Sequence, residues 1–352
     1  MKYITGRNVW PLAVSCWLLA ACSSDGTNEQ RAGSVLQVTP YITAYQNHDA
    51  LSRRAGTVSL NYNIYSPTND LAIGLFVLPP GTTQSDDVKL VRYNNGTWHS
   101  QIMVETLDYT ICGYMPKKDP ITATITATIT QDASNMELHL NNIPAVIADD
   151  VCFVTGIKDG KMTDEGDLLQ GNFTYGGNDD YNHICLLMDH LFASVKFNFS
   201  VDADYSELRI IKLKRMTLNT TKENVNAVIK LKSTNGTDPV TEITYSPSGS
   251  SSSATFFEDA VGIDIKTDAA TIHDDYSCCF APGLSNALTL VCVYDVYDRY
   301  GNKIREDCEA TNKLPNLGAV RGECWTINLN VAPTYLGRLS EKDLDDPTIT
   351  IN

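Results

Sequence analysis

The chain lacks the features that mark nucleic-acid-binding proteins and the common enzyme classes. Lys and Arg number 27 against 42 Asp and Glu, for a net charge of −15. Binding to phosphates requires clustered basic side chains, so this balance argues against nucleic acid as a partner. The Gly-x-Ser-x-Gly, His-Glu-x-x-His, P-loop and dinucleotide-binding patterns are also missing. We therefore expect no catalytic residue and no cofactor. A glycosidase active site remains an alternative, because its two carboxylates need to be close in space but not in sequence.

Tryptophan is scarce, which bears on a second class of protein. Of four tryptophans, Trp10 and Trp17 lie within the first 21 residues, which leaves Trp98 and Trp325. A surface glycan-binding lipoprotein built from β-sandwich modules would present exposed aromatic side chains. Two tryptophans are few for a glycan-binding surface, although the 17 tyrosines could take their place. Glycan binding therefore remains an alternative.

No long apolar run and no long stretch of helical period is present. The apolar run 11–19 is too short to span a bilayer, and Lys2 and Arg7 precede it, as in an export signal. Leu-Ala-Ala directly before Cys22 looks like a bacterial lipobox. We expect residues 1–21 to be a lipoprotein signal peptide and Cys22 to be lipidated, which would tether the chain to the outer membrane. An ordinary secretory signal is the alternative.

Cysteine is plentiful but forms no metal-binding pattern. Eight cysteines follow Cys22, and eight allow 105 pairings, so we assign no disulfide. Buried free thiols are the other interpretation. The chain has no Cys-x-x-Cys and no Cys/His group at zinc spacing, and the acidic run 343–346 lacks the spacing of a calcium loop. We therefore expect no metal site. His190 beside Asp189 is interpreted as structural.

Short alternating segments separated by Gly, Ser, Asn and Asp predict an all-β chain. We place a domain boundary near residue 188, which divides the mature chain into sandwich domains 55–188 and 189–352. Residues 246–253 are predicted to be a serine-rich loop. The predicted strands are Leu71–Leu78, Leu107–Met115, Ile121–Thr130, Met136–Leu140, Val151–Ile157, Ala193–Val201, Leu208–Leu213, Met216–Asn219, Val225–Leu231, Glu242–Tyr245 and Ala287–Tyr297.

An N-terminal strand over residues 35–45 precedes the first of these. Its period-two alternation predicts one buried face. Pro40 cannot donate to a ladder, so we expect an edge strand, which could leave without dismantling the sheet. A polar segment follows and ends in Arg53-Arg54. Residues 22–54 are thus a tether plus a removable strand, whose buried face comprises Leu36, Val38, Ile42 and Ala44.

The C-terminus carries two further strand-like segments, separated by a turn and an acidic stretch. These segments could be donated to a groove elsewhere, or they could pack within their own domain, and both interpretations stay open. Their alternating apolar residues are Trp325, Ile327, Leu329 and Val331, then Ile349 and Ile351.

Taken in order, the lipobox, the single strand, the Arg-Ala junction, HLFASVKFNF at 190–199 and the ending from Trp325 to Asn352 resemble the fimbrillins of Bacteroidales. These include FimA-like and Mfa-like pilus subunits (type V pilins). The resemblance implies two tandem transthyretin-like, Greek-key β-sandwich domains and no enzyme activity. It implies a lipoprotein precursor that becomes part of a cell-surface fimbria supporting adhesion.

The same resemblance implies how such a subunit assembles. An Arg-specific protease would cut between Arg54 and Ala55, remove the N-terminal strand and open a hydrophobic groove. The C-terminal segment of another copy, or of a related pilin, would fill that groove by strand addition. An anchor subunit would keep its N-terminal strand and its lipid, and that role is an alternative for this chain.

Overall fold

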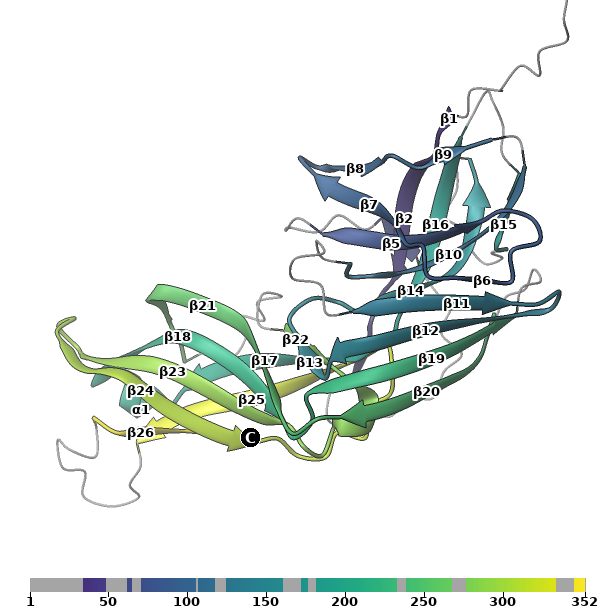
Figure 1. Ribbon diagram of the computed structural model, residues 1–352. Coiled ribbons are helices and arrows are strands. Elements are labelled where there is room, and N and C mark those ends of the chain that lie inside the picture. The colour runs from purple at the N-terminus through teal and green to yellow at the C-terminus, as the bar shows by residue number, and fades with distance from the viewer. Residues whose placement is uncertain are drawn as a thin grey trace, which may run out of the picture. The chain divides into compact units, whose positions relative to one another are not determined.

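Nearly all of the regular secondary structure in the described chain is β-strand in a computed structural model, which confirms the all-β prediction (Figure 1). Exceptions among the described residues are α1 (Ala203–Ser206) and the 3-10 turn η2 (Pro282–Leu284). No helix in this part of the chain is long and apolar enough to cross a membrane. The described residues are 34–48, 62–64, 71–105, 107–117, 125–160, 172–176, 182–232, 239–267, 277–333 and 345–351.

The largest sheet has nine strands and contains the N-terminal strand. All its pairings are antiparallel except one, between β2 and β16. Along the sheet the order is β4 (Tyr62–Ile64), β2 (Gln37–Thr43), β16 (His183–His190), β14 (Cys152–Asp159), β10 (Asp108–Met115), β5 (Ala72–Leu78), β7 (Lys89–Asn94) and β8 (Thr97–Ser100), with β15 (Thr174–Gly176) also on β10.

A five-stranded sheet joins strands from both sides of the predicted boundary at residue 188. Its central pair is β12 with β19, in a register that places Leu138 opposite Ile229. One sheet therefore continues across the boundary, and the division into two domains stays a prediction. The order is β20 (Val240–Ser248), β19 (Asn224–Lys232), β12 (Asn135–Pro144), β11 (Thr126–Gln131) and β6 (Gln84–Ser85).

Two further sheets contain the C-terminal strands. The first has six strands: β13 (Val146–Ile147), β22 (Ser277–Phe280), β17 (Ala193–Val201), β25 (Glu323–Pro333) and β26 (Pro347–Ile351), with β3 (Gln46–His48) also on β25. The second has four: β21 (Ser252–Asp264), β18 (Arg209–Thr220), β23 (Thr289–Asp298) and β24 (Lys303–Lys313). A separate pair, β1 (Ser34–Val35) with β9 (Met103–Val104), adjoins the N-terminal strand.

Apolar side chains gather in two large cores, as expected of β-sandwiches. One core unites the nine-stranded and five-stranded sheets, and includes Phe76, Phe153 and Ile229. The other unites the six-stranded and four-stranded sheets, and includes Phe197, Tyr294 and Leu329. All these strands belong to one compact unit, residues 33–352.

Three predicted elements differ from the structure. The two strands predicted over 208–219 form one strand, β18, with a bulge between Leu213 and Arg215. The predicted serine-rich loop is wrong, because β20 continues to Ser248 and β21 begins at Ser252. Gly249, with φ +74°, makes the turn between them. Several strands were not predicted. β16 is buried on both faces and shows no alternation, while few residues of β21 and β24 are buried.

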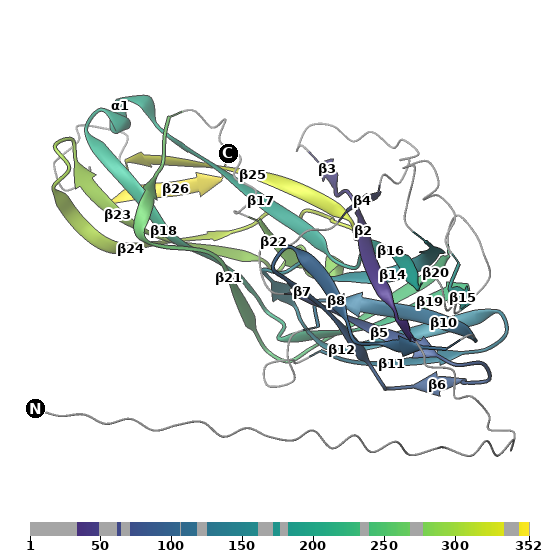
Figure 2. The same cartoon turned by 90° about the horizontal axis from the view of Figure 1, so that it is seen from above.

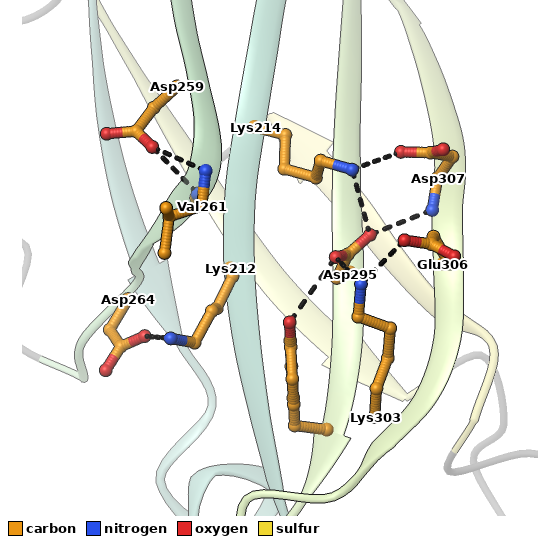
Figure 3. Close-up of polar contacts among 11 residues, drawn as sticks. Lys212, Lys214, Asp259, Val261, Asp264, Asp295, Lys303, Glu306 and Asp307 are labelled. Atoms are coloured by element: carbon orange, nitrogen blue, oxygen red, sulfur yellow. Dashed lines mark hydrogen bonds and ion pairs between the residues drawn. The ribbon is translucent and has the colours of Figure 1, made fainter.

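A buried carboxylate, Asp295, organises the four-stranded sheet (Figure 3). Its side chain is 2% exposed and lies 2.9 Å from Lys303 Nζ and 3.7 Å from Lys214 Nζ. The backbone N–H of Asp307 donates to Oδ1 at 2.9 Å. Burial raises the pKa of Asp295, but these contacts outweigh it and hold the pKa below the ordinary value. The network therefore ties β18, β23 and β24 together through one charge.

This network predicts an acid-sensitive contribution to stability. A carboxyl with a lowered folded-state pKa stabilises the protein above its unfolded pKa of about 3.9, and that contribution is lost as pH falls through the folded-state pKa. We expect Asp295→Asn to lower the free energy of unfolding by about 1–3 kcal/mol at pH 7, and the deficit to shrink below about pH 4. Urea unfolding between pH 3 and pH 7 measures this difference.

Asp264→Asn is the matched control, because Asp264 contacts Lys212 at 3.5 Å with 53% of its side chain exposed. It should change stability by less than about 0.5 kcal/mol at every pH. An equal deficit for Asp295→Asn at pH 3 and pH 7 would contradict this account of the charge.

Candidate functional site

The N-terminal strand β2 lies in a slot between β16 and β4 (Figures 1 and 2). It runs parallel to β16 from the pair Gln37 and His183 to the pair Ile42 and Met188. The other side of β2 pairs with β4 over Tyr41–Thr43. The predicted edge position is therefore wrong for Tyr41–Thr43, because a short strand from beyond the Arg pair covers that side.

Pro40 fits this slot because of the direction of its missing N–H. The N–H of Gln37 donates to the carbonyl of Asn182, on the β16 side. Since successive N–H groups of a strand alternate sides, position 40 faces away from β16. The parallel ladder to β16 therefore loses no donor at the proline, and β4 begins to pair only at Tyr41.

One face of β2 fills part of the larger core. Leu36 is fully buried, Val38 is 6% exposed and Ile42 is 7% exposed. The strand ends at Thr43, so Ala44 is exposed, and the prediction that it shares the buried face is wrong. The opposite face is also covered, because Tyr41 packs with Cys185 and Leu187 of β16 in a small separate cluster.

Polar groups hold the C-terminal end of the N-terminal strand. Thr43 Oγ1 donates to Asp189 Oδ1 at 2.9 Å, and the Thr43 carbonyl lies 2.7 Å from His190 Nε2. Tyr45 stacks on the His190 ring, with centroids 3.6 Å apart, and its hydroxyl donates to Asp150 Oδ1 at 2.7 Å. His190 therefore holds the end of the segment proposed to leave, through a hydrogen bond to Thr43 and stacking with Tyr45.

His190 and Asp150 influence each other's ionisation. Burial raises the pKa of Asp150, but the nearby His190 and its hydrogen bond outweigh burial and hold it below the ordinary value. Burial likewise lowers the pKa of His190, and Asp150 more than offsets this. The sequence offered a weak signal for Asp150, since an Asp pair at a turn is common. Only the pairing of β14 with β16 brings it to His190.

The predicted donor residues lie in two strands, one in the interior of its sheet and one at the end of the strand order (Figure 2). β25 is interior: β17 pairs along one side, while β3 and then β26 cover the other. β26 is the last strand of that order. Releasing β25 would break its ladders with β17, β3 and β26, so it is poorly placed to be donated. Its predicted donor residues are Trp325, Ile327, Leu329 and Val331. Ile349, 4% exposed, and Ile351 alternate along β26 and pack on the second core.

The segment after β2 crosses to the sheet of the C-terminal strands. β3 runs parallel to the first part of β25, and the N–H of Gln46 donates to the carbonyl of Gly322 at 2.8 Å. Residues 34–48 therefore complete two sheets, beside β16 and beside β25. The predicted lipidation site Cys22 and cleavage residues Arg54 and Ala55 lie outside the described residues.

None of the eight cysteines after Cys22 forms a disulfide, and all eight are buried, which favours the interpretation as buried thiols. Burial raises the pKa of Cys112 to about 12 and that of Cys292 to about 12. Thiols in such surroundings pack as small apolar groups and are poor nucleophiles.

Trp98 and Trp325, the two tryptophans among the described residues, are packed and form no aromatic platform. Trp98 packs against the first core and lies 5.1 Å from the Tyr93 ring, and Trp325 packs against the second core. Tyr300, 74% exposed, is the one aromatic among the prominent exposed apolar side chains of the described chain. A glycan-binding role gains no support from this distribution.

Comparisons with known proteins find likeness among solved structures only. No family model and no curated protein matches the chain. Its structural neighbours are Bacteroidales fimbrial and cell-adhesion proteins. A Bacteroides ovatus protein with a proposed role in cell adhesion is 12% identical, with a TM-score of 0.39 over 92% of this chain and 96% of that one.

Several neighbours have fimbrial names. A fimbrial protein from Bacteroides vulgatus is 11% identical, with a TM-score of 0.33 over 80% of this chain and 91% of that one. The fimbrial anchor protein Mfa2 from Porphyromonas gingivalis is 11% identical, with a TM-score of 0.20 over 90% and 97%. At these values a neighbour's function does not transfer to this chain.

The buried face of β2 predicts a large stability effect. Leu36→Ala removes a fully buried side chain, so we expect the free energy of unfolding to fall by about 2–5 kcal/mol. Chemical denaturation measures it. Val35→Ala, at a neighbouring position that is 45% exposed, should cost less than about 0.5 kcal/mol. Equal effects of the two substitutions would show that β2 does not occupy the core in solution.

Proposed function

We propose that this protein is a non-enzymatic subunit of a cell-surface fimbria, assembled by strand exchange after removal of residues 22–54. The observation that carries the proposal is the position of β2. It fills a core slot with three apolar side chains, while Arg53-Arg54 lies in the sequence between β3 and β4. A cut after Arg54 would leave β2 and β3 attached to the body by non-covalent contacts alone.

The slot is suited to a replacement strand. Leaving it empty would expose the core positions that Leu36, Val38 and Ile42 cover, at a cost of about 1.5–3 kcal/mol for each large side chain. It would also leave the backbone groups on one side of β16 unpaired, while β14 still pairs with the other side. Any segment with apolar residues at alternate positions can restore both. The emptied slot therefore favours binding of a second chain over remaining open.

β26 is the segment of this chain best placed to serve as that replacement. It spans five residues, close to the six register pairs between β2 and β16. Both strands alternate apolar and threonine-containing faces: Ile349 and Ile351 with Thr348 and Thr350, and Val38 and Ile42 with Thr39 and Thr43. As the last strand in its sheet order, β26 can leave by breaking a single ladder. The proposed donor is therefore narrowed to β26.

Export as a lipoprotein through Cys22 fits this route, because a tethered precursor would reach the outer membrane with its slot filled. An uncleaved chain would remain there as a lipid-anchored anchor subunit. The partners in this proposal are an Arg-specific protease and other copies of this chain or related pilins.

The proposal predicts the result of treating the purified precursor with an Arg-specific protease. We expect a new N-terminus at Ala55, followed by ladders of oligomers that resist SDS. N-terminal sequencing and unheated gel electrophoresis measure the two events. Arg54→Ala should stay uncut at that position and monomeric.

A chain lacking residues 347–352 is the control for the donor. It should be cut as wild type, since the cleavage site is unchanged, but should form no ladder. Monomeric cut wild type, or equal ladders from Arg54→Ala, would overturn strand exchange. Ladders from the truncated chain would overturn β26 as the donor.

A further inference from the structure

Three side chains that can bind a metal converge beside the N-terminal strand: Asp150, Cys152 and His190. Their ligand atoms all lie within 4.8 Å of one another. His190 Nδ1 is 2.9 Å from Asp150 Oδ2 and 3.5 Å from Cys152 Sγ. Cys152 is fully buried, and the side chains of His190 and Asp150 are 3% and 18% exposed. The three ligand atoms therefore share one small, nearly dry space with a narrow opening at Asp150.

The fold places these residues together by pairing two strands. Cys152 begins β14 and His190 ends β16, and the two residues are direct partners in the antiparallel ladder. Asp150 lies two positions before Cys152, directly ahead of β14, and its carboxylate contacts the imidazole of His190. Two of the three ligands are therefore held by paired strands, and the third lies directly before one of those strands.

The orientation of His190 matches that of a metal ligand. Its Nε2 lies 2.7 Å from the carbonyl of Thr43, so Nε2 carries a proton and donates it. Metal-binding histidines usually donate the other ring N–H to a carbonyl or carboxylate in this way. In the neutral imidazole, the Nδ1 lone pair then faces Asp150 and Cys152. Two lone pairs 2.9 Å apart repel unless a proton or a cation lies between the atoms.

We propose that Asp150, Cys152 and His190 bind one divalent transition-metal ion, with zinc as the best match. One carboxylate, one thiolate and one neutral imidazole carry a total charge of −2, which a divalent ion neutralises in a site that excludes water. Bonds of about 2.0–2.3 Å at tetrahedral angles place neighbouring ligand atoms about 3.4–3.6 Å apart. The distance of 3.5 Å between His190 Nδ1 and Cys152 Sγ lies in this range, and the distance of 2.9 Å between Nδ1 and Asp150 Oδ2 is about half an ångström shorter than it. A mixed nitrogen, sulfur and oxygen set favours zinc over calcium or magnesium.

The site belongs to the body of the protein. All three ligands lie after the Arg pair, whereas Thr43 and Tyr45 of the N-terminal segment orient and cover them. The proposal therefore goes beyond fimbrial assembly and does not depend on it. Cys152 would bind as a thiolate, with its proton released to solvent.

Cobalt(II) binding to the full-length chain, reduced and stripped of metal, tests the proposal. Cobalt(II) can replace zinc, and its absorption spectrum shows which ligands bind it. A thiolate ligand gives a charge-transfer band in the near ultraviolet, and tetrahedral geometry gives bands in the visible range. We expect both signals to saturate at one equivalent and to vanish when zinc is added. The rival explanation, an ion pair between protonated His190 and Asp150, predicts no thiolate band.

Two cysteine variants show whether the charge-transfer band comes from Cys152. Cys152→Ser should lose it, while Cys112→Ser, a fully buried cysteine of β10, should keep it at full intensity. Circular dichroism checks that each variant folds. If Cys152→Ser does not fold, Asp150→Asn tests the metal site in its place. We expect Asp150→Asn to weaken zinc binding by more than about tenfold in a competition assay. Absence of the band in wild type, its persistence in Cys152→Ser, its loss in Cys112→Ser, or unchanged zinc affinity in Asp150→Asn would overturn the assignment.

Discussion

The parallel ladder between β2 and β16 is the interaction on which the rest of the proposed behaviour depends. It places Leu36, Val38 and Ile42 in the first core and supplies β16 with the hydrogen-bonding neighbour that its position requires. A strand held on one side by β16 and on the other by only three residues of β4 is stable in place. The same strand is replaceable once its covalent link is cut, because its contacts are backbone bonds and alternating apolar side chains.

Polar groups at the end of this ladder also bind the N-terminal segment and hold it in place. Thr43 forms hydrogen bonds with Asp189 and His190, and Tyr45 forms one with Asp150. Arg321 forms an ion pair with Asp189. Departure of the N-terminal segment would therefore expose buried charge as well as apolar surface, and both raise the barrier to spontaneous release. A metal ion at Asp150, Cys152 and His190 would neutralise part of that charge on the body itself.

Alternation predicted the all-β class and the positions of most strands, because a half-buried strand shows its burial as period two. It predicted the buried positions of Leu36, Val38 and Ile42 for the same reason. It failed at Ala44, where the strand ends one residue earlier, and at β21 and β24, where few residues are buried. Pairings between distant strands leave no local pattern. The β12–β19 pair and the meeting of Cys152 with His190 therefore required the structure.

The most direct test of a replaceable β2 uses a cysteine that the chain already has. Thr39 is the ladder partner of Cys185, which forms no disulfide, so Thr39→Cys places two thiols across neighbouring strands, within the separation that a disulfide spans. After oxidation, confirmed by mass spectrometry, and cleavage after Arg54, the locked protein should stay monomeric. It should form SDS-resistant ladders only when reduced, while Thr39→Ser forms them under both conditions. Ladders at the same rate with the disulfide intact would show that β2 does not have to leave for subunits to join.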